Sequence, residues 1–301
     1  MKKILVAGLG LALSMTTIQA HDDHDKQEDK RDFAVTTLSD NIHVLMGING
    51  FTGGNIALLT GPDGVIMIDD SMPPLGAKLK AAIAKVTPDA VDFIINTHVH
   101  GDHTGLNAEF ARDGSWIIGH ENLRKQMKER GNGVSQTPPA EALPVITFSD
   151  EMGFHLNNER ARIIHMASAH TSGDAIIHYA EANIIHTGDL MFNGLFPYID
   201  LNSGGSVNGY LMAQQKMLSM SDDNTKIIPG HGPMSSKADL QAAVDMLQDC
   251  IAIIQKHVDE GMTEDEVVMA NPLQKYHDDW IWGFITTERM TRQLFKGLSA
   301  S

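Results

Sequence analysis

The chain has 301 residues, of which 42% are hydrophobic, and its formal net charge at pH 7 is −15. This length is sufficient for a large core, and the apolar content excludes a wholly disordered protein. The acidic balance argues against nucleic acid or an anionic membrane surface as a partner, because both are themselves negatively charged.

The first twenty residues have the layout of a secretory signal peptide. Lys2 and Lys3 precede an apolar run from Ile4 to Met15, and Ala20 is a small residue suited to cleavage. We expect cleavage after Ala20 and a periplasmic or secreted mature protein that does not contact the membrane. An uncleaved anchor or a buried first strand is the alternative, although the run is short for a membrane span.

Residues 21–32, "HDDHDKQEDKRD", contain no apolar side chain, so we interpret them as a charged flexible leader. The remaining residues, 33–301, are expected to form the folded domain. Cys250 is the only cysteine, which excludes an internal disulfide. Stability must therefore come from packing and from bound metal, if there is any.

Hydrophobic patterns along the domain predict strands and helices in alternation. In the first half we expect strands at 43–46, 55–59, 65–68, 93–95 and 116–118, helices at 75–86 and 121–130, and a loop at 130–144. In the second half we expect strands at 145–148, 162–165, 175–179, 183–186 and 226–228, a helix at 206–220, and a mostly helical tail from residue 237. Two β-rich halves, each followed by helices, predict an α/β sandwich of two sheets with helices on both outer faces.

The segment "THVHGDHTG" places His98, His100, Asp102 and His103 directly after the strand at 93–95. Alternate residues of an extended segment point the same way, so His98 and His100 can reach one metal ion. Gly101 allows a turn that directs Asp102 and His103 towards a second ion. Catalytic zinc usually takes about three protein ligands, so two ions require further ligands elsewhere.

Three later segments supply such ligands, each at the end of an expected strand. His170 lies in "SAHTSGD", Asp189 in "HTGDLMF" and His231 in "IIPGHGP". Each is followed or flanked by glycine in a loop, where functional side chains gather on a rigid scaffold.

These motifs, with "GVIMIDDS" at 64–71, resemble in order and spacing those of the metallo-β-lactamase superfamily, in particular its exported hydrolases with the HxHxDH motif. The resemblance implies a four-layered αβ/βα sandwich with a binuclear zinc site. It assigns His98, His100 and His170 to the first ion and Asp102, His103 and His231 to the second, with Asp189 as the bridge. Asp69 would support the ligands from behind, although Asp70 beside it is a second candidate.

Two zinc ions would share a bridging hydroxide that attacks a carbonyl carbon, with Asp102 or Asp189 as the catalytic carboxylate that orients it or takes its proton. The imidazole-rich first site favours zinc. Iron, as a single ion, remains an alternative metal for these ligands. Phe51, Phe196 and Tyr198 lie in loops that would form the apolar walls of a pocket for a small-molecule substrate. The alternative is that these aromatic side chains anchor their loops to the core. Trp280 and Trp282 are expected to pack in the core or at an interface.

We expect hydrolysis of a lactam or a similar amide bond. The alternatives are a lactone or thioester, as in lactonases and glyoxalase II, and a periplasmic metal-binding accessory protein with little turnover. Dedicated β-lactamases carry Cys or Ser where this chain has Asp189, which weakens the lactam assignment. The residues predict no particular oligomeric state.

Overall fold

The computed structural model describes residues 29–131 and 138–299. The expected signal peptide and most of the expected leader lie outside the described residues. The first strand begins at Asp32, the last residue that we had assigned to the leader. No helix in the described ranges is both long and apolar enough to cross a membrane.

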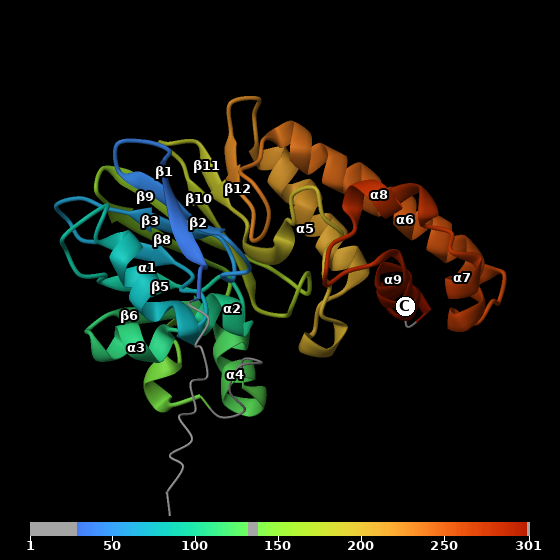
Figure 1. The fold of residues 1–301 in the computed structure, drawn as a ribbon, viewed down its shortest axis with the longest axis horizontal. Helices are drawn as coiled ribbons and strands as arrows, with labels where there is room; N and C mark the ends of the chain where they lie inside the picture. The colour runs from blue at the N-terminus through green and yellow to red at the C-terminus, as the bar shows by residue number, and fades with distance from the viewer. Residues whose placement is uncertain (1–28, 132–137, 300–301) are drawn as a thin grey trace, which may run out of the picture. The chain divides into compact units, whose positions relative to one another are not determined.

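Two β-sheets form the centre of the fold (Figure 1). The first sheet has seven strands, which lie side by side in chain order: β1 (Asp32–Thr37), β2 (Ile42–Ile48), β3 (Ile56–Leu59), β4 (Ile66–Ile68), β5 (Phe93–Ile95), β6 (Trp116–His120) and β7 (Ile146–Phe148). The second has five strands, in the spatial order β12 (Lys226–Ile228), β11 (Ile184–His186), β10 (Asp174–Tyr179), β9 (Glu159–Met166) and β8 (Glu151–Leu156).

Helices cover the outer faces of both sheets (Figure 1). Their bounds are α1 (Gly76–Ile83), α2 (Gly101–Thr104), α3 (Asn107–Arg112), α4 (Glu121–Arg130), α5 (Val207–Met220), α6 (Lys237–Asp259), α7 (Glu264–Ala270), α8 (His277–Trp280) and α9 (Thr287–Ser299). Short 3-10 turns occur at η1 (Pro73–Leu75), η2 (Ala140–Ala142), η3 (Gly188–Leu190), η4 (Leu201–Ser203) and η5 (Gln274–Tyr276).

The alternation of side chains along the strands explains the layers. In β3, Ala57 and Leu59 face the other sheet and pack with Ile163 and Ile177, while Leu58 faces α1 on the outside. Both faces of this strand are buried, so it is apolar throughout. The outer face of the second sheet packs in the same way against α5, α6 and α9. The expected four-layered αβ/βα sandwich is thus confirmed.

Several elements differ from the sequence-based expectation. Strands β1 and β8 were not expected, and β9 begins at Glu159 rather than at residue 162. Both missed strands are at the edge of a sheet, and β8 alternates between exposed and half-buried residues. Such strands carry a weak hydrophobic signal because one face remains in water. The expected helix at 75–86 is shorter, with a 3-10 turn followed by α1.

Candidate metal centre

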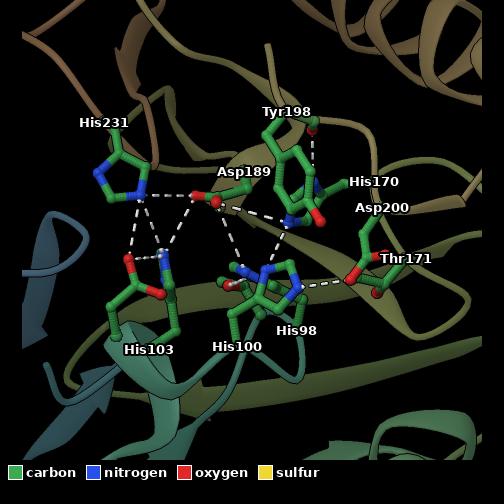
Figure 2. A network of polar contacts seen from close by, with 12 residues as sticks. His98, His100, His103, His170, Thr171, Asp189, Tyr198, Asp200 and His231 are labelled. Carbon is green, nitrogen blue, oxygen red and sulfur yellow. Dashed lines mark hydrogen bonds and ion pairs between the residues drawn. The ribbon is translucent and has the colours of Figure 1, made fainter. Parts of the chain in front are cut away.

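The seven expected ligands lie together in two neighbouring groups, on loops and short helical turns that follow strands. Figure 2 shows six of them, His98, His100, His103, His170, Asp189 and His231. The strands β4 and β5 are parallel, as are β11 and β12, so the loops after each pair leave the same edge of their sheet. Four of the expected ligands follow a strand of the seven-stranded sheet: His98, His100, Asp102 and His103. The other three follow strands of the five-stranded sheet: His170, Asp189 and His231.

The donor atoms form two groups, within each of which they lie no more than 4.8 Å apart. The first group is His98, His100, His170 and Asp189, and the second is Asp102, His103 and His231. The histidines and Asp102 are divided here as the family resemblance implied, whereas Asp189 is grouped with the first set alone.

Asp189 lies between the two groups and faces both (Figure 2). Its Oδ2 lies 3.6 Å from Nε2 of His98 and 3.5 Å from Nε2 of His170. Its Oδ1 lies 3.2 Å from Nε2 of His103 and 3.4 Å from Nε2 of His231. One carboxylate therefore offers one oxygen to each group, which is the geometry that a bridging ligand needs.

Four of the histidines have their second ring nitrogen occupied by a partner outside the donor groups. Nδ1 of His98 lies 3.0 Å from Oγ1 of Thr97, and Nδ1 of His170 lies 2.7 Å from the carbonyl oxygen of Tyr198. Carboxylates are the partners of the other two: Nδ1 of His103 lies 2.7 Å from Oδ2 of Asp69, and Nε2 of His100 lies 3.0 Å from Oδ2 of Asp200. These partners assign the ring proton to the outer nitrogen and leave the inner lone pair free for a metal ion.

Asp69, rather than Asp70, supports the ligand loop. The buried Asp69 carboxylate accepts hydrogen bonds from the amide of Thr97 at 2.8 Å, from the hydroxyl of Thr97 at 2.8 Å and from His103. Asp70 instead accepts from the amide of Leu106 at 2.9 Å, on the far side of α2. The structure thus separates the two neighbouring carboxylates that the sequence left ambiguous.

Two glycines allow the ligands to approach one another closely. A Cβ on Gly54 would lie 2.2 Å from Cε1 of His103, and a Cβ on Gly230 would lie 2.1 Å from Oδ1 of Asp189. Neither distance is compatible with a side chain. The glycines of "TGGN" and "PGHGP" therefore have a steric role at the site.

The electrostatics differ between the two groups. Burial holds the pKa of His98 well below its ordinary value and lowers that of His170 to about 4, so these imidazoles are neutral. Burial also opposes charge on His231, but Asp189 and Asp102 outweigh it and raise its pKa to about 9. For Asp102 burial is likewise outweighed, by His103 and His231, and its pKa falls to about 2. In the second group the carboxylates therefore stabilise positive charge on the imidazoles, and a bound cation would take the place of those protons.

The donor set fits divalent metal ions. Among the described residues, Nε2 of His98 and Oδ1 of Asp189 are buried and have no hydrogen-bond partner. An unpartnered buried polar atom costs free energy, and both atoms point into the donor groups. Neutral imidazoles and carboxylates are also the ligands that zinc and similar ions prefer.

A cavity of about 620 Å³ opens onto the donor groups. Phe51 and Tyr198 line it, as expected from the sequence, but Phe196 does not. Phe196 is fully buried and packs in the core beneath α5 and α6, so its interpretation as a pocket wall is wrong. Trp282 takes that position instead, because its indole Nε1 donates to the backbone oxygen of Phe196 at 2.9 Å and its ring lines the cavity.

The sequence analysis also missed Asp200, the partner of His100 (Figure 2). The side chain lies in the loop after Asp189, where it caps the turn η4 by accepting from the amides of Asn202 and Ser203. An Asp followed by Asn and Ser indicates such a cap, but it does not indicate what the second oxygen contacts.

A four-layered sandwich with two adjacent His/Asp donor groups at its edge defines a class of metallohydrolases. The model of the metallo-β-lactamase superfamily matches residues 49–231, more than half of the chain, and the protein belongs to this superfamily. A solved structure, the metallo-β-lactamase from Pontibacter korlensis, superposes with a TM-score of 0.61 over 72% of this chain and 99% of its own, at 17% identity.

Two curated relatives are similar to this chain in sequence, at low identity. The 2,4-dinitroanisole O-demethylase subunit alpha of Nocardioides sp. (strain JS1661) is 24% identical over 70% of this chain, and the hydroxyacylglutathione hydrolase of Polaromonas sp. (strain JS666 / ATCC BAA-500) is 25% identical over 54%. The match spans 59% and 56% of the length of these relatives, respectively.

Proposed function

We propose that this protein is a binuclear zinc-dependent hydrolase that acts on the carbonyl group of a small ester, thioester or cyclic amide. The observation that carries the proposal is Asp189, whose two oxygens face two separate groups of histidine ligands. One relative, 25% identical over 54% of this chain, is named a hydroxyacylglutathione hydrolase, which supports a hydrolase. The other relative is named a 2,4-dinitroanisole O-demethylase subunit alpha.

Two zinc ions held by these residues would lower the pKa of a shared water towards neutrality and polarise the carbonyl oxygen of the substrate. Asp102 and Asp189 differ in their access to that substrate. The side chain of Asp102 is 21% exposed, whereas that of Asp189 is 5% exposed. Asp102 can therefore accept a hydrogen bond from the attacking water and orient it, while Asp189 holds the two halves of the site together.

The test combines metal analysis with turnover. We expect the zinc-loaded protein to hold about two ions per chain, as the two donor groups require, and to hydrolyse at least one of three substrates, nitrocefin, a lactone and a thioester. His98→Ala should lower the zinc content and abolish turnover. The matched control is His155→Ala, because His155 is exposed in β8 and lies outside both donor groups.

Two results would contradict the proposal separately. Full zinc content in His98→Ala would show that the ligand assignment is wrong. Two bound ions without turnover of any of the three substrates would instead reject the hydrolase and favour a metal-binding accessory protein.

A further inference from the structure

The cavity beside the candidate metal centre is walled by apolar side chains from four separate parts of the chain. Phe51 comes from the β2–β3 loop, Met72 from the loop after β4, and Phe192 and Tyr198 from the loop after β11. Trp282 and Phe284 come from the segment between α8 and α9, which lies beyond residue 231, where the family match ends. The C-terminal helices thus contribute a wall that the matched part of the chain does not contain.

These aromatic rings lie directly against the metal ligands. The ring of His231 stacks on Phe51 at 5.6 Å, on Phe192 at 5.2 Å and on Trp282 at 6.3 Å between centroids. On the other side of the site, Tyr198 stacks on His100 at 5.8 Å. A group held by these rings would therefore lie next to the carbonyl that reacts.

Two of the rings are unusually exposed for their size. Phe51 is 51% exposed and Phe284 is 43% exposed, and both line the same cavity. Exposed apolar surface that gathers at a concave site indicates a binding function, because burying it against a ligand is favourable.

Outside the donor groups, the described part of the cavity wall carries no basic side chain that could recognise an acidic substrate. Among the described residues that line the cavity, none is Lys or Arg, and the charged groups are the donor residues themselves. The nearby Arg289 does not line the cavity, but it packs against two of the rings that do, with its guanidinium 5.5 Å from the centre of the Tyr198 ring. Its guanidinium lies 3.7 Å from the centre of the Phe284 ring, and its Nη1 donates to the backbone oxygen of Phe284 at 3.0 Å.

From this geometry we propose that the substrate is an uncharged ester or lactone with an aromatic ring, and that Phe51 and Phe284 select for that ring. This inference rests on the proposed hydrolase function. In the reaction, the water oxygen bonds to the carbonyl carbon as the bond to the alcohol or phenol oxygen breaks. One water proton goes to that leaving oxygen, and the other is released as the acid ionises.

The zinc-loaded full chain should accordingly prefer 2-naphthyl acetate to ethyl acetate, nitrocefin and S-lactoylglutathione. Nitrocefin and S-lactoylglutathione carry carboxylates, and S-lactoylglutathione has no aromatic ring. We expect Phe284→Ala and Phe51→Ala each to lower kcat/KM for 2-naphthyl acetate about 10-fold, mainly through KM, because each removes one aromatic contact. For ethyl acetate the same variants should lower kcat/KM by a smaller factor than for 2-naphthyl acetate, because an ethyl group buries less apolar surface against the rings.

Two control variants make the comparison specific. Trp116→Ala removes an aromatic side chain that is 57% exposed but lies outside the cavity, and it should leave both substrates unaffected. Arg289→Ala tests for an anionic substrate. If nitrocefin or S-lactoylglutathione were the best substrate and Arg289→Ala selectively removed its turnover, the inference would be overturned.

Calorimetry with the product 2-naphthol separates this inference from the proposed function. Binding by the zinc-loaded wild type, weakened by Phe284→Ala but not by Trp116→Ala, would support the aromatic site even if no ester were hydrolysed. Conversely, turnover that is equally fast for all four substrates and unchanged in both Phe variants would reject the aromatic site while the hydrolase stands.

Discussion

The Asp200 carboxylate has two oxygens with different tasks. Oδ2 accepts a hydrogen bond from Nε2 of His100 at 3.0 Å, while Oδ1 accepts from the amides of Asn202 and Ser203 at 3.1 Å each. Because the proton of His100 is held on Nε2, its Nδ1 lone pair faces the first donor group. Asp200 is therefore a positioning residue that links the loop 198–203 to a metal ligand.

Asp200→Asn should weaken metal binding although the shape of the side chain is retained. An amide that keeps the cap at η4 presents an N–H to His100, which already carries a proton there. We expect zinc affinity to fall about 10- to 100-fold, as is usual when a partner of a metal-bound histidine is lost. Competition with a chromophoric chelator measures this affinity directly and does not depend on turnover.

The control is Asp239→Asn, which alters the capping box of α6 far from the metal ligands. It should change stability without changing zinc affinity. If Asp200→Asn bound zinc as tightly as the wild type, Asp200 would be only a cap for its own loop.

The sequence motifs were sufficient to select the seven residues that form the two donor groups, because each follows a strand and lies beside a turn. They were not sufficient to predict Asp200 or Trp282, since neither lies near a ligand in the sequence. Trp282 is positioned at the cavity by two contacts with Phe196: its indole donates to the backbone oxygen of Phe196, and the amide of Phe196 donates to the backbone oxygen of Trp280 at 2.7 Å. The indole contact spans 86 residues of chain and depends on how α8 and α9 pack.

At the scale of elements, helix α5 holds the loop that carries Asp189. The hydroxyl of Tyr210 in α5 donates to the backbone oxygen of Asp189 at 2.9 Å, and both groups are buried. By contrast, the hydroxyl of Tyr179 in β10 is buried without a hydrogen-bond partner among the described residues. The two tyrosines form a natural pair for measuring what one such bond contributes.

Tyr210→Phe should lower the free energy of unfolding by about 1 kcal/mol, because it removes a buried hydrogen bond and leaves a carbonyl without its donor. Tyr179→Phe should be neutral or slightly stabilising, because it removes a hydroxyl that has no partner. Urea denaturation of the zinc-free proteins compares the two. Equal effects of both substitutions would show that the bond to Asp189 contributes nothing.

The position of a strand in its sheet explains whether it could be predicted from the sequence. Central strands such as β3 and β10 are buried on both faces and appear in the sequence as apolar runs. The edge strand β8 contains Gly153 and His155, and its pairing with β9 follows from the Asn157–Asn158 turn, where both residues have positive φ. That pairing is a property of the hairpin rather than of hydrophobic periodicity.

For the whole molecule, the important feature is that each donor group combines residues from both sheets. In the first group His98 and His100 follow the seven-stranded sheet, while His170 and Asp189 belong to the five-stranded one. In the second group His231 from the five-stranded sheet meets Asp102 and His103. Metal ions bound there would connect the two halves of the sandwich.

Metal removal should therefore destabilise the fold without abolishing it. Next to the site the sheets are also joined by backbone hydrogen bonds, from Ala175 to Thr97 and from Asn55 to Gly230, each 2.8 Å long, and by the shared apolar core. An ion present at about 100 times its Kd adds about 2.7 kcal/mol to the stability of the folded state. For a chain of this size that corresponds to a fall in Tm of about 5–10 °C when a chelator removes the ion.

Scanning calorimetry with EDTA, and again after zinc is restored, measures this fall in Tm and its reversal. His98→Ala should show a smaller zinc-dependent shift, because it lacks one donor of the first group, whereas a Tm that EDTA leaves unchanged in the wild type would show that no metal joins the sheets.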